Sequence, residues 1–365
     1  MAVERLVEHF GAVVDPRCRG KVEHRLTDIL VIAVCAVIAC AESWNDIALY
    51  GRSKLAWLRT FLELPNGIPS HDTFRRVFML IDPEAFEVGF SAWAGSLVAG
   101  FEREVVAIDG KTLRRSFDRK HEHAPLHLVS AWASEQDLVL GQRCVDDKSN
   151  EITAIPELLD RLALQNSIVT VDAMGCQTAI AERILARGAD YLLTYAAVAE
   201  HFEQHCFRCG APGRADCDAF DDTHGRLVRR RVLASTEAAK LEALSAWPRL
   251  HTVLAVETIR SVNGRPKVET EIRYFLSSCR DDPSTLGRAI RTHWGIENAL
   301  HWVLDVTFRE DDSRVRDRRA ARNLALLRRI AVNLVGRDRS AKASGRARRK
   351  KAAWNDDYML QLLAG

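Results

Sequence analysis

Three carboxylates stand in segments whose residue types could hold metal ions. Asp109 and Asp172 each follow a short apolar, β-branched run, and Glu297 lies within a helical pattern. Carboxylate oxygens are the ligands that hard divalent ions prefer, and rigid strand ends commonly open a side chain to a cleft. If folding brings the three together, two Mg²⁺ or Mn²⁺ ions could activate an oxygen nucleophile and stabilise the leaving oxygen of a phosphodiester. The three positions therefore predict metal-dependent chemistry on phosphodiesters.

Each carboxylate also has an ordinary structural interpretation. Asp109 with Gly110 could form a hairpin turn, Asp172 could cap the segment that follows it, and Glu297 could be a solvated helix residue. Strand ends favour the catalytic interpretation of the two aspartates, because the backbone there is rigid.

The surroundings of Glu297 have a regular spacing. His293, Glu297, His301 and Asp305 recur every four residues, so a helix would place them on one face. Two histidines and two carboxylates could bind a transition metal. We favour a catalytic acidic face on which His293 and His301 contact the substrate or orient carboxylates.

Positive charge is concentrated near the C-terminal end. Residues 313–351 hold 12 Arg and 3 Lys against 2 Asp, a net charge of +13. Because the whole chain carries +3, the remainder carries −10. A basic segment on an acidic body indicates a polyanionic partner such as DNA. The basic residues that we expect to hold substrate phosphates are Lys111, Arg114, Arg115, Arg314, Arg316, Arg318 and Arg319.

The first 100 residues have a helical pattern. The apolar run 29–41 is too short to cross a membrane and predicts a buried helix. A second helix is predicted over 44–62. A third begins after Ser70, which has the chemistry of an N-cap, and ends at Asp82-Pro83.

Two exposed arginines are expected on the third of these helices. Residues 44–70 and the helix that follows could form a helix-turn-helix-like unit that presents Arg75 and Arg76 to DNA. The alternative is a plain helical bundle whose arginines are solvated.

Strand patterns begin at residue 104 and alternate with helices. Strands are predicted at 104–108, 126–132, 138–142, 167–171 and 190–194. Helices are predicted at 152–162 and 178–187. Strand, helix, strand with short loops favours an α/β core with a mixed sheet. Residues 196–278 are turn-rich and predict a β-rich insertion with strands at 227–234, 252–261 and 267–277.

The last third of the chain is mostly helical by its pattern. A long helix is predicted from Pro283 through Ile290, Glu297 and Trp302, with Trp294 and Trp302 as packing aromatics. An amphipathic helix follows at 320–335, with a basic, solvated linker at 345–351.

Cysteine usage predicts a reducing environment. Nine cysteines without a secretory segment indicate mostly free, buried thiols and a cytoplasmic protein without membrane association. One dense group could hold a structural zinc ion, although chance clustering is the favoured explanation. Its members are His201, His205, Cys206, Cys209, Cys217 and His224.

Over nearly its whole length the chain resembles the H-repeat-associated DDE transposases of bacterial insertion sequences. The phrases that carry the resemblance are Asp15-Pro16-Arg17, Lys21-Val22-Glu23-His24, Gly67-Ile68-Pro69-Ser70-His71-Asp72-Thr73, Ala107-Ile108-Asp109-Gly110-Lys111-Thr112-Leu113-Arg114, Lys148-Ser149-Asn150-Glu151-Ile152, Asp172-Ala173-Met174-Gly175-Cys176-Gln177 and His293-Trp294-Gly295-Ile296-Glu297-Asn298.

The resemblance implies a ribonuclease-H-like fold in which Asp109, Asp172 and Glu297 form the metal-binding triad. It implies a helical, DNA-binding N-terminal domain over 1–100, a catalytic domain over 101–335 and a basic tail over 336–365. The implied cofactors are two Mg²⁺ or Mn²⁺ ions. The implied partners are the double-stranded DNA of transposon ends and target, bound by a homodimer in the bacterial cytoplasm at the nucleoid.

The chain departs from the family pattern at two places. It has Ala196-Ala197-Val198-Ala199 where members tend to have Lys-Gly-Asn-Gln, and Thr178 where a lysine is usual. Two alternatives to a complete transposase therefore remain open. One is a decayed or repurposed, non-catalytic DNA-binding protein. The other is a metal-dependent nuclease without strand transfer.

Overall fold

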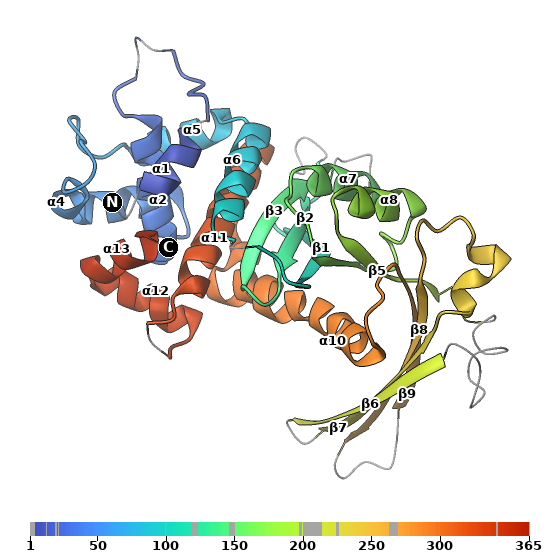
Figure 1. The fold of residues 1–365 in the computed structure, drawn as a ribbon. Coiled ribbons are helices and arrows are strands. Elements are labelled where there is room, and N and C mark those ends of the chain that lie inside the picture. Colours follow the sequence, from blue (N-terminus) through green and yellow to red (C-terminus); the bar gives the residue numbers. More distant parts are fainter. Residues whose placement is uncertain are drawn as a thin grey trace. The chain divides into compact units, whose positions relative to one another are not determined.

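The computed structural model describes residues 4–11, 13–18, 20, 22–98, 100–117, 123–145, 150–196, 199, 214–223, 226–262, 269–340 and 342–364. The chain forms two compact units, which are treated separately (Figure 1). The first, called the helical unit, consists of Met1–Ala99, Gly110–Leu162 and Ile296–Gly365. The second, called the sheet unit, consists of Gly100–Asp109 and Ala163–Gly295.

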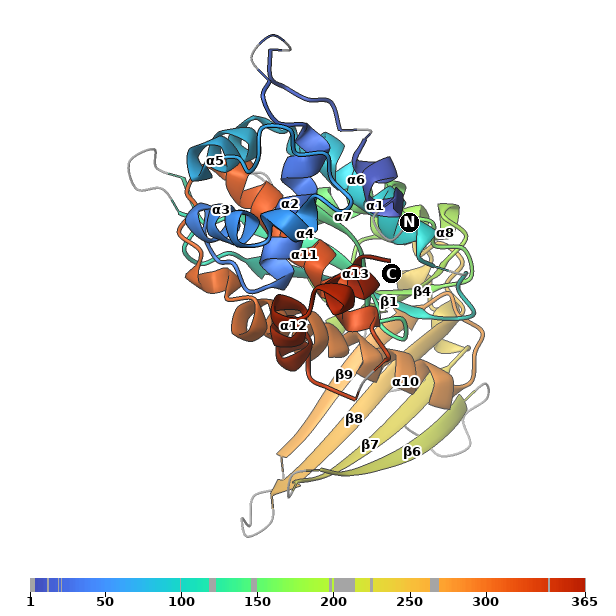
Figure 2. The same ribbon diagram turned by 90° about the vertical axis from the view of Figure 1, so that its left-hand side faces the viewer.

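The helical unit is built around two buried helices. Its helices are α1 (Glu4–Phe10), α2 (Leu26–Ile38), α3 (Trp44–Ser53), α4 (Leu55–Leu58), α5 (His71–Leu80), α6 (Pro83–Ser96), α7 (Glu151–Asp160), α11 (Arg318–Arg337), α12 (Gly345–Trp354) and α13 (Asp356–Ala364). Helix α2 is apolar on nearly every side and packs against α11, as both views show (Figures 1 and 2). The predicted buried helix is confirmed, and it ends three residues earlier than expected.

Local capping chemistry explains several helix boundaries. Ser70 accepts a hydrogen bond from the backbone N–H of Thr73 at 3.2 Å, which confirms it as the N-cap of α5. Asp82 caps α6 in the same way, and Pro83 takes its first position. The single helix expected over 44–62 is instead two helices, α3 and α4, separated by Lys54.

Helix α11 confirms the predicted amphipathic helix and is held by buried amide side chains. Asn323 donates to the carbonyl oxygens of Phe78 and Ile81 at 2.9 and 3.1 Å. Asn333 exchanges two hydrogen bonds with the backbone of Val139, at 2.8 and 2.9 Å. These bonds satisfy polar groups that would otherwise be costly to bury.

The predicted solvated linker at 345–351 is wrong, because this segment forms α12. Ser344 caps the helix by accepting from Ala347 N at 3.2 Å. Arg349 is 4% exposed, donates to the carbonyl oxygens of Val37 and Ile38, and lies 3.9 Å from the Phe308 ring centroid. Its guanidinium thereby satisfies the open C-terminal carbonyls of α2.

The sheet unit contains a mixed sheet in the order β1-β4-β5-β9-β8-β7-β6. Its elements are β1 (Val105–Thr112), β4 (Ile168–Val171), α8 (Thr178–Ala186), β5 (Asp190–Thr194), β6 (Arg214–Thr223), β7 (Arg226–Ser235), β8 (Thr252–Val262), β9 (Glu269–Ser277) and α10 (Pro283–His293). Strands β1, β4 and β5 are parallel, and the other strands are antiparallel. The α/β core with a mixed sheet is confirmed.

The three strands predicted within residues 196–278 are confirmed as β7, β8 and β9. Strand β9 pairs with β5, with Leu193 opposite Leu276, so the insertion continues the sheet. Strand β6 was not predicted. Its polar sequence lacks the apolar alternation that marks a half-buried strand.

Strand β1 passes from the sheet unit into the helical unit. Its last residues lie beside β2 (His127–Ala133), which pairs with β3 (Leu138–Cys144). The hairpin-turn interpretation of Asp109 and Gly110 is wrong, since both residues lie inside β1.

Position 110 requires a glycine because two other side chains lie very close to its backbone. A Cβ atom there would lie 2.1 Å from Glu151 Oε1 and 2.4 Å from His127 Nε2. His127 contacts Glu151 at 2.5 Å and Thr112 Oγ1 at 2.8 Å. The glycine after Asp109 therefore makes room for a polar cluster that supports β1.

The described cysteines are all free thiols, and Cys35, Cys144, Cys176 and Cys279 are buried. Among the described residues, no helix is both long and apolar enough to cross a membrane.

Candidate active site

Asp109 and Asp172 follow paired residues on neighbouring strands. Strands β1 and β4 run parallel, and their register places Ile108 opposite Val171. The next residue on each strand is the aspartate, and both side chains are half-buried. Parallel neighbours direct their carboxyl ends to the same edge of a sheet, so the two carboxylates share that edge.

The Asp172 carboxylate is oriented by backbone groups. Its Oδ1 atom accepts hydrogen bonds from Met174 N at 3.0 Å and Gly175 N at 3.2 Å. Burial raises the pKa of the nearby Cys176 thiol to about 12, and the charge of Asp172 adds to this effect. The cysteine therefore stays protonated, and this edge carries carboxylate rather than thiolate chemistry.

Glu297 belongs to the helical unit and begins a π-helical segment. The long helix predicted through this residue ends at His293, and η5 (Glu297–His301) and η6 (Val303–Thr307) follow as π-helix. Such wide turns are rare and occur frequently at functional sites. The Glu297 side chain is 55% exposed, so its carboxylate is accessible.

His301 contacts Glu297 directly. Its Nδ1 atom lies 3.3 Å from Glu297 Oε2, and its side chain is buried. Burial lowers the pKa of His301, although the charge of Glu297 opposes this shift. A neutral imidazole therefore stands beside the Glu297 carboxylate at neutral pH.

The other two residues of the predicted four-residue face have different partners. His293 is buried in the sheet unit, where Nδ1 lies 2.8 Å from Thr170 Oγ1 on β4. Asp305 pairs with Lys111 Nζ at 2.7 Å in the helical unit. Glu297 and His301 are thus paired with each other, and any substrate contact by His293 or His301 stays a prediction.

Lys111 does not lie on the surface. Its side chain is 7% exposed and is surrounded by carboxylates. Arg114 and Arg115, by contrast, are 82% and 50% exposed and make ion pairs of 3.3 and 3.5 Å with Asp311 and Asp312. Exposed pairs of this kind are weak, so a phosphate could replace the carboxylate.

Most of the other arginines predicted to contact DNA have exposed side chains. Arg75 is 48% exposed and pairs with Asp72 at 3.4 Å, and Arg76 is exposed on the same helix. Arg314, Arg316 and Arg319 are exposed, whereas Arg318 is half-buried and donates to Ala124 O. Their contacts with DNA remain predictions.

A basic groove in the sheet unit was missed by sequence reasoning. It is a cavity of about 520 Å³ between α10 and strands β6 to β9. The floor contains Val232, Val256, Phe275 and Ile290, all buried. The charged residues that line it are Arg230, Arg260, Arg273, Arg288, Arg291 and Glu271. Figure 2 shows α10 lying across these strands.

Trp294 stands at this groove and packs against neighbouring side chains, since its ring centroid lies 5.5 Å from that of His293, although it is not fully buried. Its side chain is 46% exposed, and the Arg273 guanidinium lies 4.7 Å from its ring centroid. Trp302, in the helical unit, is 55% exposed. The arginines come from three strands and from α10. Only strand pairing and the packing of α10 bring them together, so no local signal could have identified the groove.

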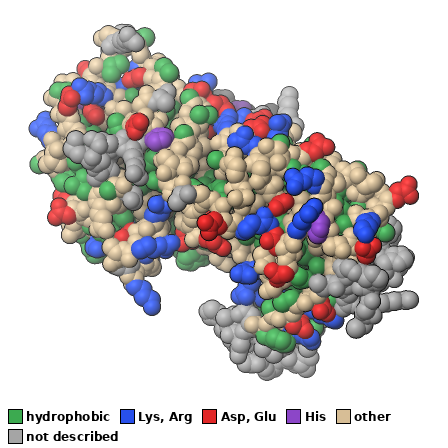
Figure 3. Space-filling model, in the orientation of Figure 1, with side chains coloured by type: hydrophobic (Ala, Val, Ile, Leu, Met, Phe, Trp, Pro, Cys, Tyr) green, Lys and Arg blue, Asp and Glu red, His purple; other side chains and the backbone are tan. Residues whose placement is uncertain are grey.

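Basic and acidic side chains are interspersed over the face drawn in Figure 3. The net charge calculated for a sequence segment is therefore a poor guide to the local surface. Arg328 and Arg329, both within the basic segment 313–351, are buried.

The zinc-binding prediction falls largely outside the described residues, which include only Cys217 of the six candidates. Cys217 lies on β6 and lines the basic groove. At the second departure from the family pattern, Thr178 begins α8.

Known proteins resemble the chain along its entire length. The family model described as "Transposase DDE domain" matches residues 100–334, and the one described as "DDE_Tnp_1-associated" matches residues 7–94. "H repeat-associated putative transposase YhhI" of Escherichia coli K12 is 38% identical over 375 residues, which cover 100% of this chain and 99% of that protein.

Two further relatives differ in coverage. "Putative transposase YncI" of Escherichia coli O157:H7 is 38% identical and covers 100% of this chain and 95% of its own length. "Inactive transposase YbfQ" of Escherichia coli K12 is 44% identical over 77 residues, which cover 21% of this chain and 92% of that protein.

Proposed function

The chain belongs to the H-repeat-associated family of DDE transposases, and from this premise we propose that it cleaves DNA at insertion-sequence ends and transfers the strands to target DNA. The observation that carries the proposal is the placement of Asp109 and Asp172 after paired residues of parallel strands. Two carboxylates at one sheet edge provide the start of a divalent-metal site.

The donor chemistry fits Mg²⁺ or Mn²⁺. Asp109, Asp172 and Glu297 offer only oxygen atoms, and the thiol near Asp172 stays protonated. Asp109, Asp172 and Glu297 would together hold the two ions. When bound, such ions lower the pKa of the attacking hydroxyl or water and stabilise the departing oxygen.

The protein's own residues orient these ligands. Met174 N and Gly175 N hold one oxygen of Asp172 in place. His301 contacts Glu297 with a neutral ring, so it fixes the carboxylate without cancelling its charge. Preorganised ligands of this kind need little rearrangement when the substrate arrives.

We further propose that double-stranded DNA is held by the exposed arginines and by the basic groove. The groove residues Arg273 and Arg288 and the helix residues Arg75 and Arg76 are accessible. Phosphate contacts of this kind position DNA without selecting its sequence. The proposal also includes that the protein binds DNA as a homodimer and acts at the bacterial nucleoid.

The groove has its own test, which is the salt dependence of DNA affinity. Replacing Arg273 and Arg288 by Gln should lower the affinity and reduce the slope of log K against log salt by about 2, since each lost phosphate contact removes about 0.9. The matched control is Arg183→Gln on the exposed side of α8. An unchanged slope in the double variant would exclude the groove from the DNA-binding surface.

A non-catalytic DNA-binding protein is the second candidate. Alanines at Ala196 and Ala199 replace polar residues of the family pattern, and one relative is named inactive. A nuclease without strand transfer is the third candidate.

One experiment separates the three candidates. Purified protein is incubated with a duplex that carries the inverted repeats flanking its gene, a supercoiled target plasmid and Mg²⁺, with Ca²⁺ as the control ion. Cleaved ends and joined products support the transposase. Cleaved ends without joined products indicate a nuclease, and binding without cleavage indicates the non-catalytic protein.

A further inference from the structure

Lys111 carries a buried charge inside a group of carboxylates. Its Nζ atom lies 2.7 Å from Asp305 Oδ1, 3.1 Å from Asp311 Oδ1 and 3.8 Å from Glu310 Oε2. The Lys111 side chain is 7% exposed, and that of Glu310 is 0% exposed. A DNA phosphate could reach this amine only by displacing three negative groups, so a phosphate contact is disfavoured.

Two arginines balance the charge of this cluster from α11. Arg329 Nη1 lies 3.0 Å from Glu310 Oε1, and Arg328 Nη1 lies 4.0 Å from the same oxygen. With Arg114, which pairs with Asp311 at 3.3 Å, four cations therefore face the three carboxylates. Burial alone would raise the pKa of Glu310, but Arg329, Arg328 and Lys111 outweigh it and lower the value. Such a cluster is rigid, because each charge needs its partners.

The cluster connects the two segments that carry candidate metal ligands. Lys111 is two residues beyond Asp109 on β1, and alternate residues of a strand point to the same face. Asp305 lies on η6, which continues the π-helical run that begins at Glu297. The Lys111–Asp305 pair thus holds the helix of Glu297 against the strand end that follows Asp109.

We propose that Lys111 is a positioning residue for the metal site: its buried amine fixes the π-helical segment so that the Glu297 carboxylate is held ready for a divalent ion. The inference rests on the proposed function. It also replaces the prediction from sequence that Lys111 holds a substrate phosphate.

The principal test is Mn²⁺ affinity without DNA, measured by electron paramagnetic resonance of free Mn²⁺. Lys111→Met removes the charge but keeps most of the side-chain volume, and its Mn²⁺ affinity should fall at least tenfold, since losing a group that orients ligands typically costs roughly 10- to 100-fold. Lys111→Arg keeps the cation and should stay within about threefold of the wild type.

Two further variants separate positioning from general stability. Asp305→Asn leaves Lys111 with Asp311 and Glu310, so it should fold and show a smaller loss of Mn²⁺ affinity, about threefold. Arg322→Met disrupts another ion network of the helical unit, which includes the buried Glu87. It should lower the melting temperature without changing Mn²⁺ affinity.

The outcomes are distinct. If Lys111→Met, or Asp305→Asn where the first variant does not fold, binds Mn²⁺ like the wild type, Lys111 is not a positioning residue. The affinity for insertion-sequence-end DNA is also measured in EDTA. If Lys111→Met binds this DNA more weakly than Arg322→Met does, Lys111 contacts a DNA phosphate and the inference is overturned. A wild-type protein that neither binds Mn²⁺ nor cleaves DNA would instead refute the proposed function, and the inference with it.

Discussion

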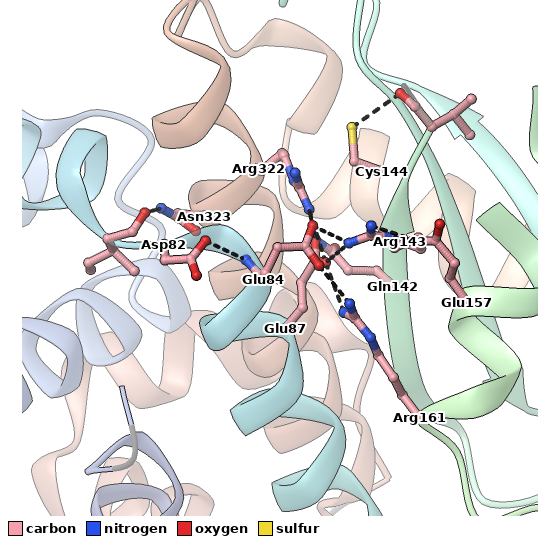
Figure 4. Close-up of polar contacts among 12 residues, drawn as sticks. Asp82, Glu84, Glu87, Gln142, Arg143, Cys144, Glu157, Arg161, Arg322 and Asn323 are labelled. Carbon is pink, nitrogen blue, oxygen red and sulfur yellow. Dashed lines mark hydrogen bonds and ion pairs between the residues drawn. The ribbon is translucent and has the colours of Figure 1, made fainter. Parts of the chain in front are cut away.

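Carboxylates occur in two contrasting environments in this protein. On α6, Glu84 and Glu87 face the guanidinium groups of Arg143, Arg161 and Arg322 (Figure 4). Arg322 Nη2 lies 2.8 Å from Glu84 and 3.1 Å from Glu87, which is 1% exposed. These acids are neutralised by fixed cations that join α6 to β3 and α11.

Asp172 and Glu297 are held in a different way. Backbone N–H groups orient Asp172, and a neutral imidazole contacts Glu297. Uncharged donors fix the direction of a carboxylate but leave its negative charge available. Under the proposed function, the first group of carboxylates stabilises the fold, whereas the second keeps its charge available for a divalent ion.

The largest expected effect is on catalysis. Asp109→Asn, Asp172→Asn or Glu297→Gln should each reduce DNA cleavage by at least about 1,000-fold, because losing a metal ligand removes several kcal/mol of transition-state stabilisation. Unfolding temperature and DNA affinity should change little. Glu182→Gln, an exposed carboxylate on α8, is the control. Turnover close to the wild type in any of the three would remove that residue from the triad.

Disrupting the arginine network should lower stability instead. Arg322→Met removes the nearest cation of the buried Glu87 and leaves only the longer contacts of Arg143 and Arg161. Because breaking a buried pair costs about 3 kcal/mol, the free energy of unfolding should fall by up to that amount. Urea titration measures this loss, with Arg114→Met, at an 82% exposed position, as the control. Two results would contradict the distinction between structural and metal-binding carboxylates. One is that Arg322→Met is as stable as the control, and the other is that it changes the Mg²⁺ concentration required for cleavage.

The smallest effect is a difference in acid stability. Burial would raise the pKa of Glu84, but hydrogen bonds from Arg143, Arg161 and Arg322 hold it at about 2, below its usual value of 4.5. The stability that the ion pairs of Glu84 contribute is therefore complete above pH 4.5 and is lost as the pH falls towards 2, because the unfolded chain takes up the proton first.

Glu84→Gln tests this pH dependence. The free energy of unfolding should depend less steeply on pH between 4.5 and 2 in the variant than in the wild type. Burial raises the pKa of Glu87, so its protonation in the folded state partly offsets the loss and keeps the effect small. Parallel curves for the two proteins would show that Glu84 is not held by its arginines.

Sequence alone identified those features that depend on neighbouring residues. The short apolar runs before Asp109 and Asp172 predicted the strands that carry them, because burial of β-branched residues is a local pattern. The N-cap at Ser70 and the buried helix α2 followed from the same kind of signal. Asp109, Asp172 and Glu297 were identified as candidate metal ligands from short sequence motifs, which are also local features.

Tertiary structure alone decided what the charged and aromatic side chains do. Lys111 lies in a cluster with residues about 200 positions away, and Arg349 caps a helix more than 300 positions away. The groove arginines come from three strands and from α10. A lysine or arginine has the same local sequence signal whether it is solvated or buried. Whether such a side chain is buried depends on whether carboxylates and carbonyl groups compensate the free-energy cost of removing its charge from water. Those groups come from distant parts of the sequence, and only folding brings them close.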